Sequence, residues 1–217
     1  MSTLISRLPL VVAAAAMASA WFLTDALGRD TAMPDTSAAR PVGATLAALR
    51  QGGYVMVVRN AATEPNDGEC LSDLGRLGAS GIGALLAREH VPLKAIHAST
   101  DSGSAETASR IALRVLPGMQ VMPLASAKTS SDAATTALRR LTSTSPGSIA
   151  NLLVVVRNEQ LQGVLGIAGV KEGEIVVLRP QESDLAERPL VFARLTLNDL
   201  SAYTAAHRTH ARARSSL

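Results

Sequence analysis

Cysteine and aromatic residues are scarce in this sequence. Cys70 is the only cysteine among 217 residues, which excludes an intramolecular disulfide and requires a fold that holds without one in any compartment. Aromatic residues make up 2% of the chain, so Leu, Val, Ile and Ala must build the core. A chain of this length holds one domain of ordinary size and a short extension.

The sequence also lacks a strong excess of either charge. Its formal net charge is +3, and its basic residues are dispersed except in the last segment, residues 207–217. A dispersed charge of this size gives no reason to expect a nucleic-acid partner. Residues 207–217 have no apolar periodicity, so we expect a solvated basic tail that binds anionic lipid head groups weakly at most.

The N-terminus has the three parts of a secretory signal peptide. Residues 1–7 are cationic, residues 8–17 are apolar, and Ala18-Ser19-Ala20 supplies small residues at the usual cleavage spacing. We therefore expect residues 1–20 to be removed and the protein to be periplasmic or secreted. The alternative is an uncleaved inner-membrane anchor, although the apolar stretch is shorter than the roughly 20 residues that span a bilayer. Membrane association is expected only in that case.

Apolar runs and amphipathic segments alternate along the rest of the chain. Residues 21–42 are rich in Asp, Thr, Ser, Ala and Pro and are predicted to be a linker, so the domain is expected to cover residues 43–206. The predicted strands are 54–58, 93–98, 119–124, 151–156, 173–178 and 190–197, and the predicted helices are 44–50, 72–89, 104–116, 131–141 and 198–206. This alternation predicts an α/β fold, a three-layer α/β/α sandwich with a mainly parallel central sheet.

Ligands of such sheets bind beyond the carboxyl ends of the strands, which directs attention to the loops after residues 58, 98 and 156. Along the chain stand Arg59-Asn60, then Leu71-Ser72-Asp73-Leu74-Gly75-Arg76, then Glu106-Thr107-Ala108, and finally Arg157-Asn158. In this order the four segments resemble the signature of the histidine phosphatase superfamily, which includes phosphoglycerate mutases and many small phosphatases. The resemblance covers about residues 52–180 and implies a phosphoglycerate mutase-like fold.

The positions that carry the chemistry depart from this family pattern. In the family, a His after the first strand attacks the phosphoryl group, an Arg-bearing loop neutralises charge, and a second His follows a later strand. Asn60 stands at the first His position, Gly103 and Ala105 at the Arg positions of the loop, and Arg157 at the second His position. An amide nitrogen has its lone pair delocalised and is no nucleophile. The sequence therefore predicts a pseudophosphatase, with no catalytic residue, metal or cofactor.

Anion binding does not require the lost nucleophile. The candidate ligands for a phosphate-containing small molecule or another anion are Arg59, Asn60, Thr63 and Arg157. We expect Arg59 and Arg157 to face one another across the carboxyl edge of the sheet. The alternative is that they pair with acids such as Glu64 or Glu106 and bind nothing. An unidentified protein partner is a further expectation for a domain without turnover.

Two other interpretations of the same residues stay open. One is an active phosphatase on small phosphoesters that uses water or a different nucleophile. Hydroxyl groups in the predicted loops belong to Thr63, Ser99, Thr100, Ser102 and Ser104. None has an obvious base, and the nearest histidine is His97. The other interpretation is a structural relic with a closed pocket and no ligand.

The signal peptide gives the first prediction. The mature protein begins at Trp21, because Ala18 and Ala20 have the small side chains that signal peptidase accepts. N-terminal sequencing of the exported protein checks this, and recovery of intact Met1 in the membrane fraction would show instead that the apolar segment is retained as an anchor.

Overall fold

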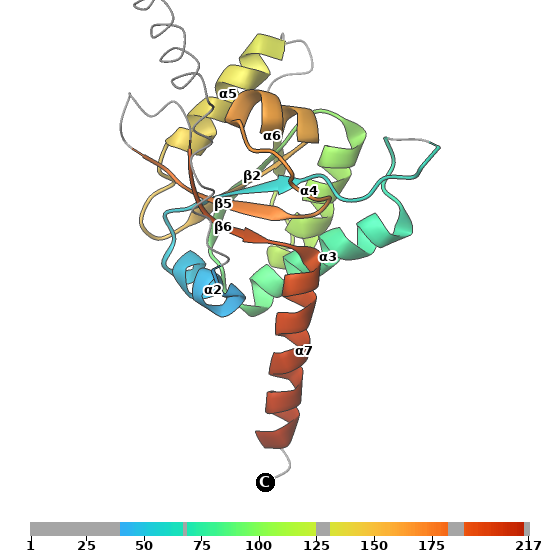
Figure 1. Cartoon of the computed structure of the whole chain (residues 1–217), viewed down its shortest axis with the longest axis vertical. Helices are drawn as coiled ribbons and strands as arrows, with labels where there is room; N and C mark the ends of the chain where they lie inside the picture. Colours follow the sequence, from blue (N-terminus) through green and yellow to red (C-terminus); the bar gives the residue numbers. More distant parts are fainter. Residues whose placement is uncertain (1–39, 67–68, 125–130, 182–188, 215–217) are drawn as a thin grey trace, which may run out of the picture. The chain divides into compact units, whose positions relative to one another are not determined.

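The computed structural model describes residues 40–66, 69–124, 131–181 and 189–214 (Figure 1). The predicted signal peptide and nearly all of the predicted linker, residues 1–39, lie outside the described residues. Among the helices of the described part, none has the length and hydropathy of a membrane span.

The centre of the domain is a six-stranded sheet with the order β3-β2-β4-β1-β5-β6. Its strands are β1 (Val55–Arg59), β2 (Leu93–Ala98), β3 (Val121–Pro123), β4 (Asn151–Val156), β5 (Ile175–Arg179) and β6 (Leu190–Leu195). Strands β1 to β4 run parallel to one another, whereas β5 is antiparallel to both β1 and β6. The mainly parallel sheet expected from the sequence is thereby confirmed. Because β1 and β4 are central, every residue of β4 is buried, as its continuous apolar run predicts.

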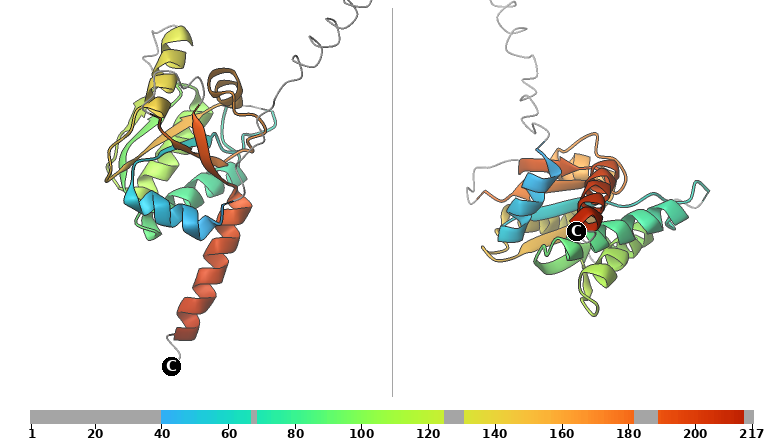
Figure 2. Two further views of the ribbon diagram at one scale, coloured as in Figure 1. Left: turned by 60° about the vertical axis from the view of Figure 1, so that its left-hand side comes forward. Right: turned by 90° about the horizontal axis from the view of Figure 1, so that it is seen from below.

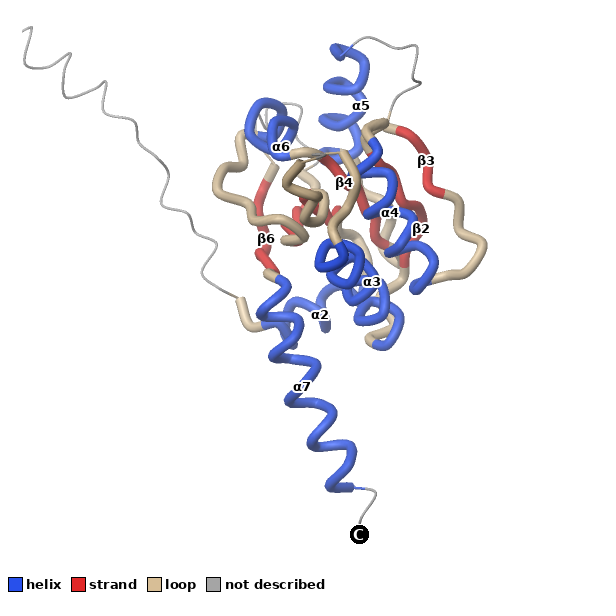
Figure 3. The backbone as a smooth tube through the Cα atoms, turned by 90° about the vertical axis from the view of Figure 1, so that its right-hand side faces the viewer, coloured by secondary structure: helices blue, strands red, loops and turns tan. Residues whose placement is uncertain are grey.

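Helices cover both faces of this sheet. The helices are α2 (Val42–Gln51), α3 (Asp73–Arg88), α4 (Ser102–Val115), α5 (Ser131–Ser143), α6 (Asn158–Leu165) and α7 (Leu197–Arg214). Helices α2, α3, α4 and α7 share one hydrophobic cluster with the sheet, which we call the α3/α4 face. Helices α5 and α6 share the other, the α5/α6 face, and Figures 1 and 3 show them on the opposite side of the strands. The three-layer sandwich is confirmed.

Side chains of β1 and β4 alternate between these two faces. Met56 and Val58 belong to the α3/α4 cluster, and Val55 and Val57 belong to the α5/α6 cluster. On β4 the same alternation places Val155 on the α3/α4 face and its neighbours on the other. The same alternation determines to which face the side chain at the end of each strand points.

Two helices differ from the sequence-based expectation. Helix α6 was not predicted, because its two buried apolar residues, Leu161 and Leu165, are too few to establish a helical period. The predicted end of the last helix near Ala206 is wrong, since α7 continues to Arg214. Its sequence contains neither Gly nor Pro, and the Ala and Arg residues after Ala206 favour helix. Figure 2 shows α7 extending beyond the other elements.

A buried amide connects the edges of several elements at the amino end of β4. Asn151 is fully buried, and its Nδ2 donates to Leu49 O at 2.7 Å and to Pro92 O at 3.0 Å. Its Oδ1 accepts from the Tyr54 N–H at 3.1 Å. One side chain thus satisfies backbone groups at the end of α2 and at the starts of β1 and β2, where water has no access.

This network gives a prediction about stability. Asn151→Ala is expected to lower the free energy of unfolding by about 2 kcal/mol, because it leaves the Tyr54 N–H without its partner, removes one hydrogen bond each from Leu49 O and Pro92 O, and creates a small cavity. Asn198→Ala, the same change at an exposed position of α7, should shift it by less than about 0.5 kcal/mol. Urea unfolding of both variants is the measurement, and equal effects would contradict the role given to Asn151.

Candidate functional site

The loops after β1, β2 and β4 meet at one edge of the sheet, as the parallel arrangement predicts. Arg59 is in register with Val156, and the Asn60 N–H donates to Val156 O at 2.9 Å. The Ser99 N–H donates to Val155 O at 3.0 Å. The candidate residues after β1 and β4 therefore start from adjacent backbone positions, and only the direction of each side chain separates them.

Arg59 extends toward the α5/α6 face. It follows Val55 and Val57 in the alternation of β1, and its Nη1 donates to Val170 O at 2.7 Å. Its Nη2 lies 3.5 Å from Glu172 Oε1, and its Nε is buried without a hydrogen-bond partner in the described part of the chain. The guanidinium of Arg59 is therefore bound by residues 170–172, in the segment before β5.

Arg157 extends toward the other face. It follows Val155 in the alternation of β4, and its Nε lies 3.5 Å from Asp101 Oδ1 at the start of α4. The expectation that Arg59 and Arg157 face one another is therefore wrong: Arg59 is in register with Val156, so Arg157 lies one residue further along and points to the opposite face. Both arginines do pair with acids, but with Glu172 and Asp101 rather than with the expected Glu64 or Glu106.

Asn60, Thr63 and Gly103 lie together on the α3/α4 face. A Cβ atom at Gly103 would be 3.4 Å from Asn60 Nδ2 and 3.5 Å from Thr63 Cγ2. Among the described residues, the Asn60 amide group makes one hydrogen bond, a long one from Nδ2 to Ala61 O at 3.4 Å. The structure thus brings Asn60 and Thr63 together beside the first turn of α4, on the same face of the sheet as Arg157, and leaves Arg59 on the other face.

The Leu71-Ser72-x-x-Gly75-Arg76 segment holds the loop that carries Asn60. The Ser72 N–H and Oγ both donate to Ala62 O, at 2.9 and 3.2 Å, and the same Oγ accepts from the Gly75 N–H at 3.1 Å, which caps α3. A Cβ atom at Gly75 would lie 2.0 Å from Ala62 O, so only glycine allows this approach. The segment therefore docks α3 directly on the loop after β1.

The Glu106-Thr107 pair supports the same loop from α4. Thr107 Oγ1 accepts from the Ala61 N–H at 3.1 Å and donates to Gly103 O at 2.7 Å. Glu106 accepts from Arg76 Nε at 3.1 Å and from Arg110 Nε at 2.9 Å. Partial burial raises the pKa of the Glu106 carboxyl, but the hydrogen bonds from Arg110 and Arg76 outweigh it and hold the pKa below its usual value. From the sequence, Glu106 and Thr107 were known only as part of a segment that resembles the family signature. Their contacts show that they support the backbone of residues 60–63.

In the ranges that the structure describes, none of the alternative hydroxyl nucleophiles is hydrogen-bonded to a carboxylate or an imidazole. Ser99 Oγ donates to Gln160 Oε1 at 2.5 Å, and Ser102 Oγ donates to Glu69 O at 3.1 Å. Ser104 is fully buried, and its Oγ makes no hydrogen bond to any described residue. Burial lowers the pKa of His97, which extends from β2 and is not hydrogen-bonded to any of these hydroxyls. Within the described ranges, no three His, Cys, Asp or Glu residues gather as metal ligands would.

Comparison with solved structures identifies the architecture. A structure of the protein histidine phosphatase SixA complexed with tungstate superposes with a TM-score of 0.51 at 12% identity, covering 68% of this chain and 99% of SixA. The domain has the histidine phosphatase fold. This bears out the phosphoglycerate mutase-like fold that the four sequence segments implied.

Other histidine phosphatase folds are similar at lower TM-scores. A SixA protein from Agrobacterium tumefaciens matches at 0.46 with 16% identity, over 67% of this chain and 98% of its own. A phosphoglycerate mutase from Bacillus anthracis matches at 0.47 with 13% identity, over 70% and 97%. No protein-family model matches the sequence, and no curated protein sequence is significantly similar to it.

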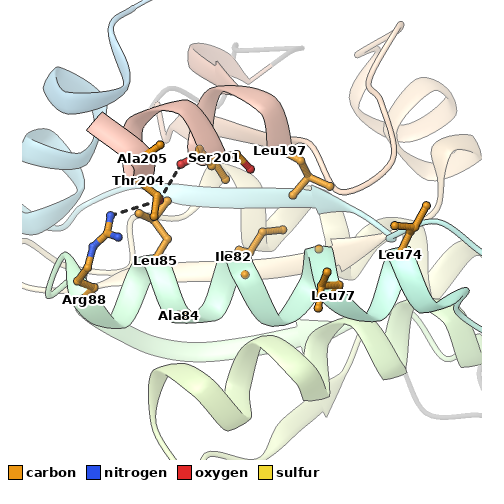
Figure 4. Close-up of a pocket in the computed structure, with 13 residues that line it drawn as sticks. Leu74, Leu77, Ile82, Ala84, Leu85, Arg88, Leu197, Ser201, Thr204 and Ala205 are labelled. Atoms are coloured by element: carbon orange, nitrogen blue, oxygen red, sulfur yellow. Dashed lines mark hydrogen bonds between the residues drawn. The ribbon is translucent and has the colours of Figure 1, made fainter. Parts of the chain in front are cut away.

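A groove of about 550 Å³ lies between α3 and α7 (Figure 4). Its lining is mainly apolar, with Ile82 and Leu85 on α3 and Leu197 and Leu200 on α7. Leu77 also lines it and is 73% exposed. The groove lacks the convergent polar groups of a catalytic site, so the carboxyl edge remains the candidate site on this histidine phosphatase fold.

Two glycines of α3 provide a matched prediction. Gly75→Ala is expected to destabilise the protein by about 2 kcal/mol, because the new Cβ would clash with Ala62 O and displace α3 from the loop. Gly81→Ala has open space around its Cβ position and should stabilise the helix by about 0.5–1 kcal/mol. Chemical denaturation distinguishes the two, and a gain in stability for Gly75→Ala would refute the close docking of α3.

Proposed function

We propose that this protein is an exported, non-catalytic domain with the histidine phosphatase fold that binds a phosphate-like oxyanion. The observation that carries the proposal is Asn60. It is the first residue after β1, at the position of the nucleophilic His in the family pattern, and in the described part of the chain Ser99 and Ser102 donate to an amide and a backbone carbonyl rather than to a base.

The chemistry of the amide separates binding from turnover. Phosphoryl transfer through the enzyme needs a lone pair that can attack phosphorus, a group that stabilises the charge on the equatorial oxygens, and a proton for the leaving group. Asn60 Nδ2 can donate hydrogen bonds to an oxyanion, but it cannot form the covalent intermediate. A site built around this residue holds its ligand without transferring the phosphoryl group.

The α3/α4 face supplies the groups that would hold the anion. Asn60 Nδ2 has only one long hydrogen bond, Thr63 adds a hydroxyl, and Arg157 adds a permanent positive charge whose side chain is 46% exposed. Arg59 is engaged on the opposite face by Val170 O and Glu172, so we assign it no direct contact with the ligand. Small phosphate-containing molecules fit this chemistry, and tungstate, the ligand in the SixA structure, is a probe of the same class.

Export is the second part of the proposal, and it rests on residues 1–20. A cationic start, an apolar run and a small-residue cleavage site are the requirements of a secretory signal. A domain outside the cytoplasm acts on ligands or proteins of that compartment, and the cellular fraction in which the protein is recovered tests this part independently.

Turnover and covalent labelling test the main proposal. The purified mature protein should release no phosphate from a broad panel of small phosphoesters and should carry no covalent phosphate after incubation with labelled phosphodonors. Stable labelling would contradict the proposal. Turnover that is lost when Thr63, Ser99 or Ser102 is changed to Ala would show an active phosphatase with a different nucleophile.

Partial restoration of the family residues makes a sharper prediction. Asn60→His alone should give little or no phosphatase activity, because the loop cation is missing at Gly103 and Arg157 stands at the second His position. Loss of one charge-stabilising donor alone costs about a hundredfold or more in rate, and such groups act as a unit.

The triple variant Asn60→His, Gly103→Arg, Arg157→His is the informative comparison. It should show measurable turnover if the scaffold is intact and only the chemistry is lost. The space at Gly103 is limited, since Glu69 O lies 3.3 Å from its Cβ position, so thermal unfolding must first show that the variant is folded. Activity of the single variant equal to that of the triple variant would contradict this account.

A further inference from the structure

Asp101 is a negative charge at the centre of the region assigned to the anion. It precedes α4, and its Oδ1 accepts a hydrogen bond from the Ser104 N–H at 2.8 Å. The same Oδ1 lies 3.5 Å from Arg157 Nε. One carboxylate oxygen is therefore in contact with a backbone donor at a helix N-terminus and with a guanidinium, which are the two kinds of group that recognise an oxyanion.

We propose that Asp101 acts as an internal anion that occupies the oxyanion seat beside Arg157 and must be displaced before an external oxyanion binds. This inference rests on the proposed binding function and assigns its regulation to one side chain. Asp101 is mostly buried, with 17% of its side chain exposed, whereas Arg157 is 46% exposed. Asp101 is the less accessible partner, so an external anion reaches the guanidinium from solvent and gains the contact with Nε only by displacing the carboxylate.

The Ser104 side chain is a second observation at this position. It lies in the first turn of α4, is fully buried, and has an Oγ atom without a hydrogen-bond partner in the described part of the chain. Buried hydroxyl groups are normally paired, so among the described residues the Ser104 Oγ atom is a free donor in the same turn of α4 that Asp101 caps. The Ser104 N–H is taken by Asp101 in the present arrangement.

A tethered carboxylate competes effectively with a free anion. Because Asp101 belongs to the same chain, its effective concentration at Arg157 is high, and the apparent affinity for an external oxyanion falls by the fraction of molecules in which the seat is open. The contact of 3.5 Å is longer than a good charged hydrogen bond of about 2.7–2.9 Å, so the pair can be separated. Removal of the charge should expose the cation without unfolding the helix start.

The substitution Asp101→Asn isolates this effect. Asparagine is as good an N-cap as aspartate, since its side-chain oxygen also accepts from the N–H in the first turn. We expect tungstate and inorganic phosphate to bind the mature Asp101→Asn protein at least about tenfold more tightly than the unmodified protein. Asp101→Ser, which also retains a cap and removes the charge, should give the same direction if the asparagine variant folds poorly.

Two further variants show whether the gain comes from Arg157. Asp132→Asn removes the same charge from the first turn of α5, on the other face of the sheet, and should leave the affinity unchanged. In the double variant Asp101→Asn, Arg157→Gln the gain should disappear. Isothermal titration gives the dissociation constants, and the melting temperature of each variant without ligand shows that it is folded.

The outcomes separate this inference from the proposed function. A tenfold gain in oxyanion affinity for Asp101→Asn that requires Arg157 supports both the internal anion and the proposed binding function. Arg157-dependent binding that is equal in the unmodified and Asp101→Asn proteins overturns the internal anion and leaves the binding function standing. A gain of equal size in Asp132→Asn reduces the effect to net charge and overturns the inference. Absence of binding in every variant overturns both.

Discussion

The carbonyl oxygen of Ala62 is the contact on which the candidate site depends. It accepts hydrogen bonds from the N–H and the hydroxyl of Ser72, and Gly75 provides the space that lets the first turn of α3 approach it. Thr107 holds the other side of the same loop through the Ala61 N–H. A short loop restrained from two helices has little freedom left, so the position of Asn60 follows from contacts in which its own side chain takes no part.

The contacts that hold the loop are separate from the Asn60 side chain. The fold can therefore persist although this residue differs from the His of the family pattern. The groups that stabilise the loop are backbone atoms, caps and one glycine, and they contribute to folding whatever residue follows Arg59. The Asn60 side chain makes a single long hydrogen bond and adds little to stability. A nucleophile at that position is therefore of use to catalysis only, and a change there costs the fold almost nothing.

Charge at the carboxyl edge is balanced within the chain. Arg59 meets Glu172 and a backbone carbonyl, Arg157 meets Asp101, and Arg76 and Arg110 share Glu106. A partly buried guanidinium that lacks a partner is costly, so each arginine acquires an acid from the nearest segment. The same pairing lowers the positive potential that an external anion would meet at this edge.

The sequence by itself determined the three layers of this fold and the succession of its strands along the chain. The sequence pattern predicted β2 and β4 with the bounds that the structure has, the helix predicted from residue 72 is α3 with Ser72 as its cap, and four segments in order implied the histidine phosphatase fold. These features are local, because periodicity, caps and turns depend on residues close together in the chain.

Only the tertiary structure decided where the charged residues of the site point and what they contact. Arg59 and Arg157 are adjacent across β1 and β4 yet extend to opposite faces, because the register pairs Arg59 with Val156 and so offsets the two arginines by one step of the alternation. Asp101 and Glu172 were not expected as their partners, since the loops that bring them close are folded by contacts far away in sequence. Side-chain direction at a sheet edge is a property of strand register, and register is decided by packing of the whole core.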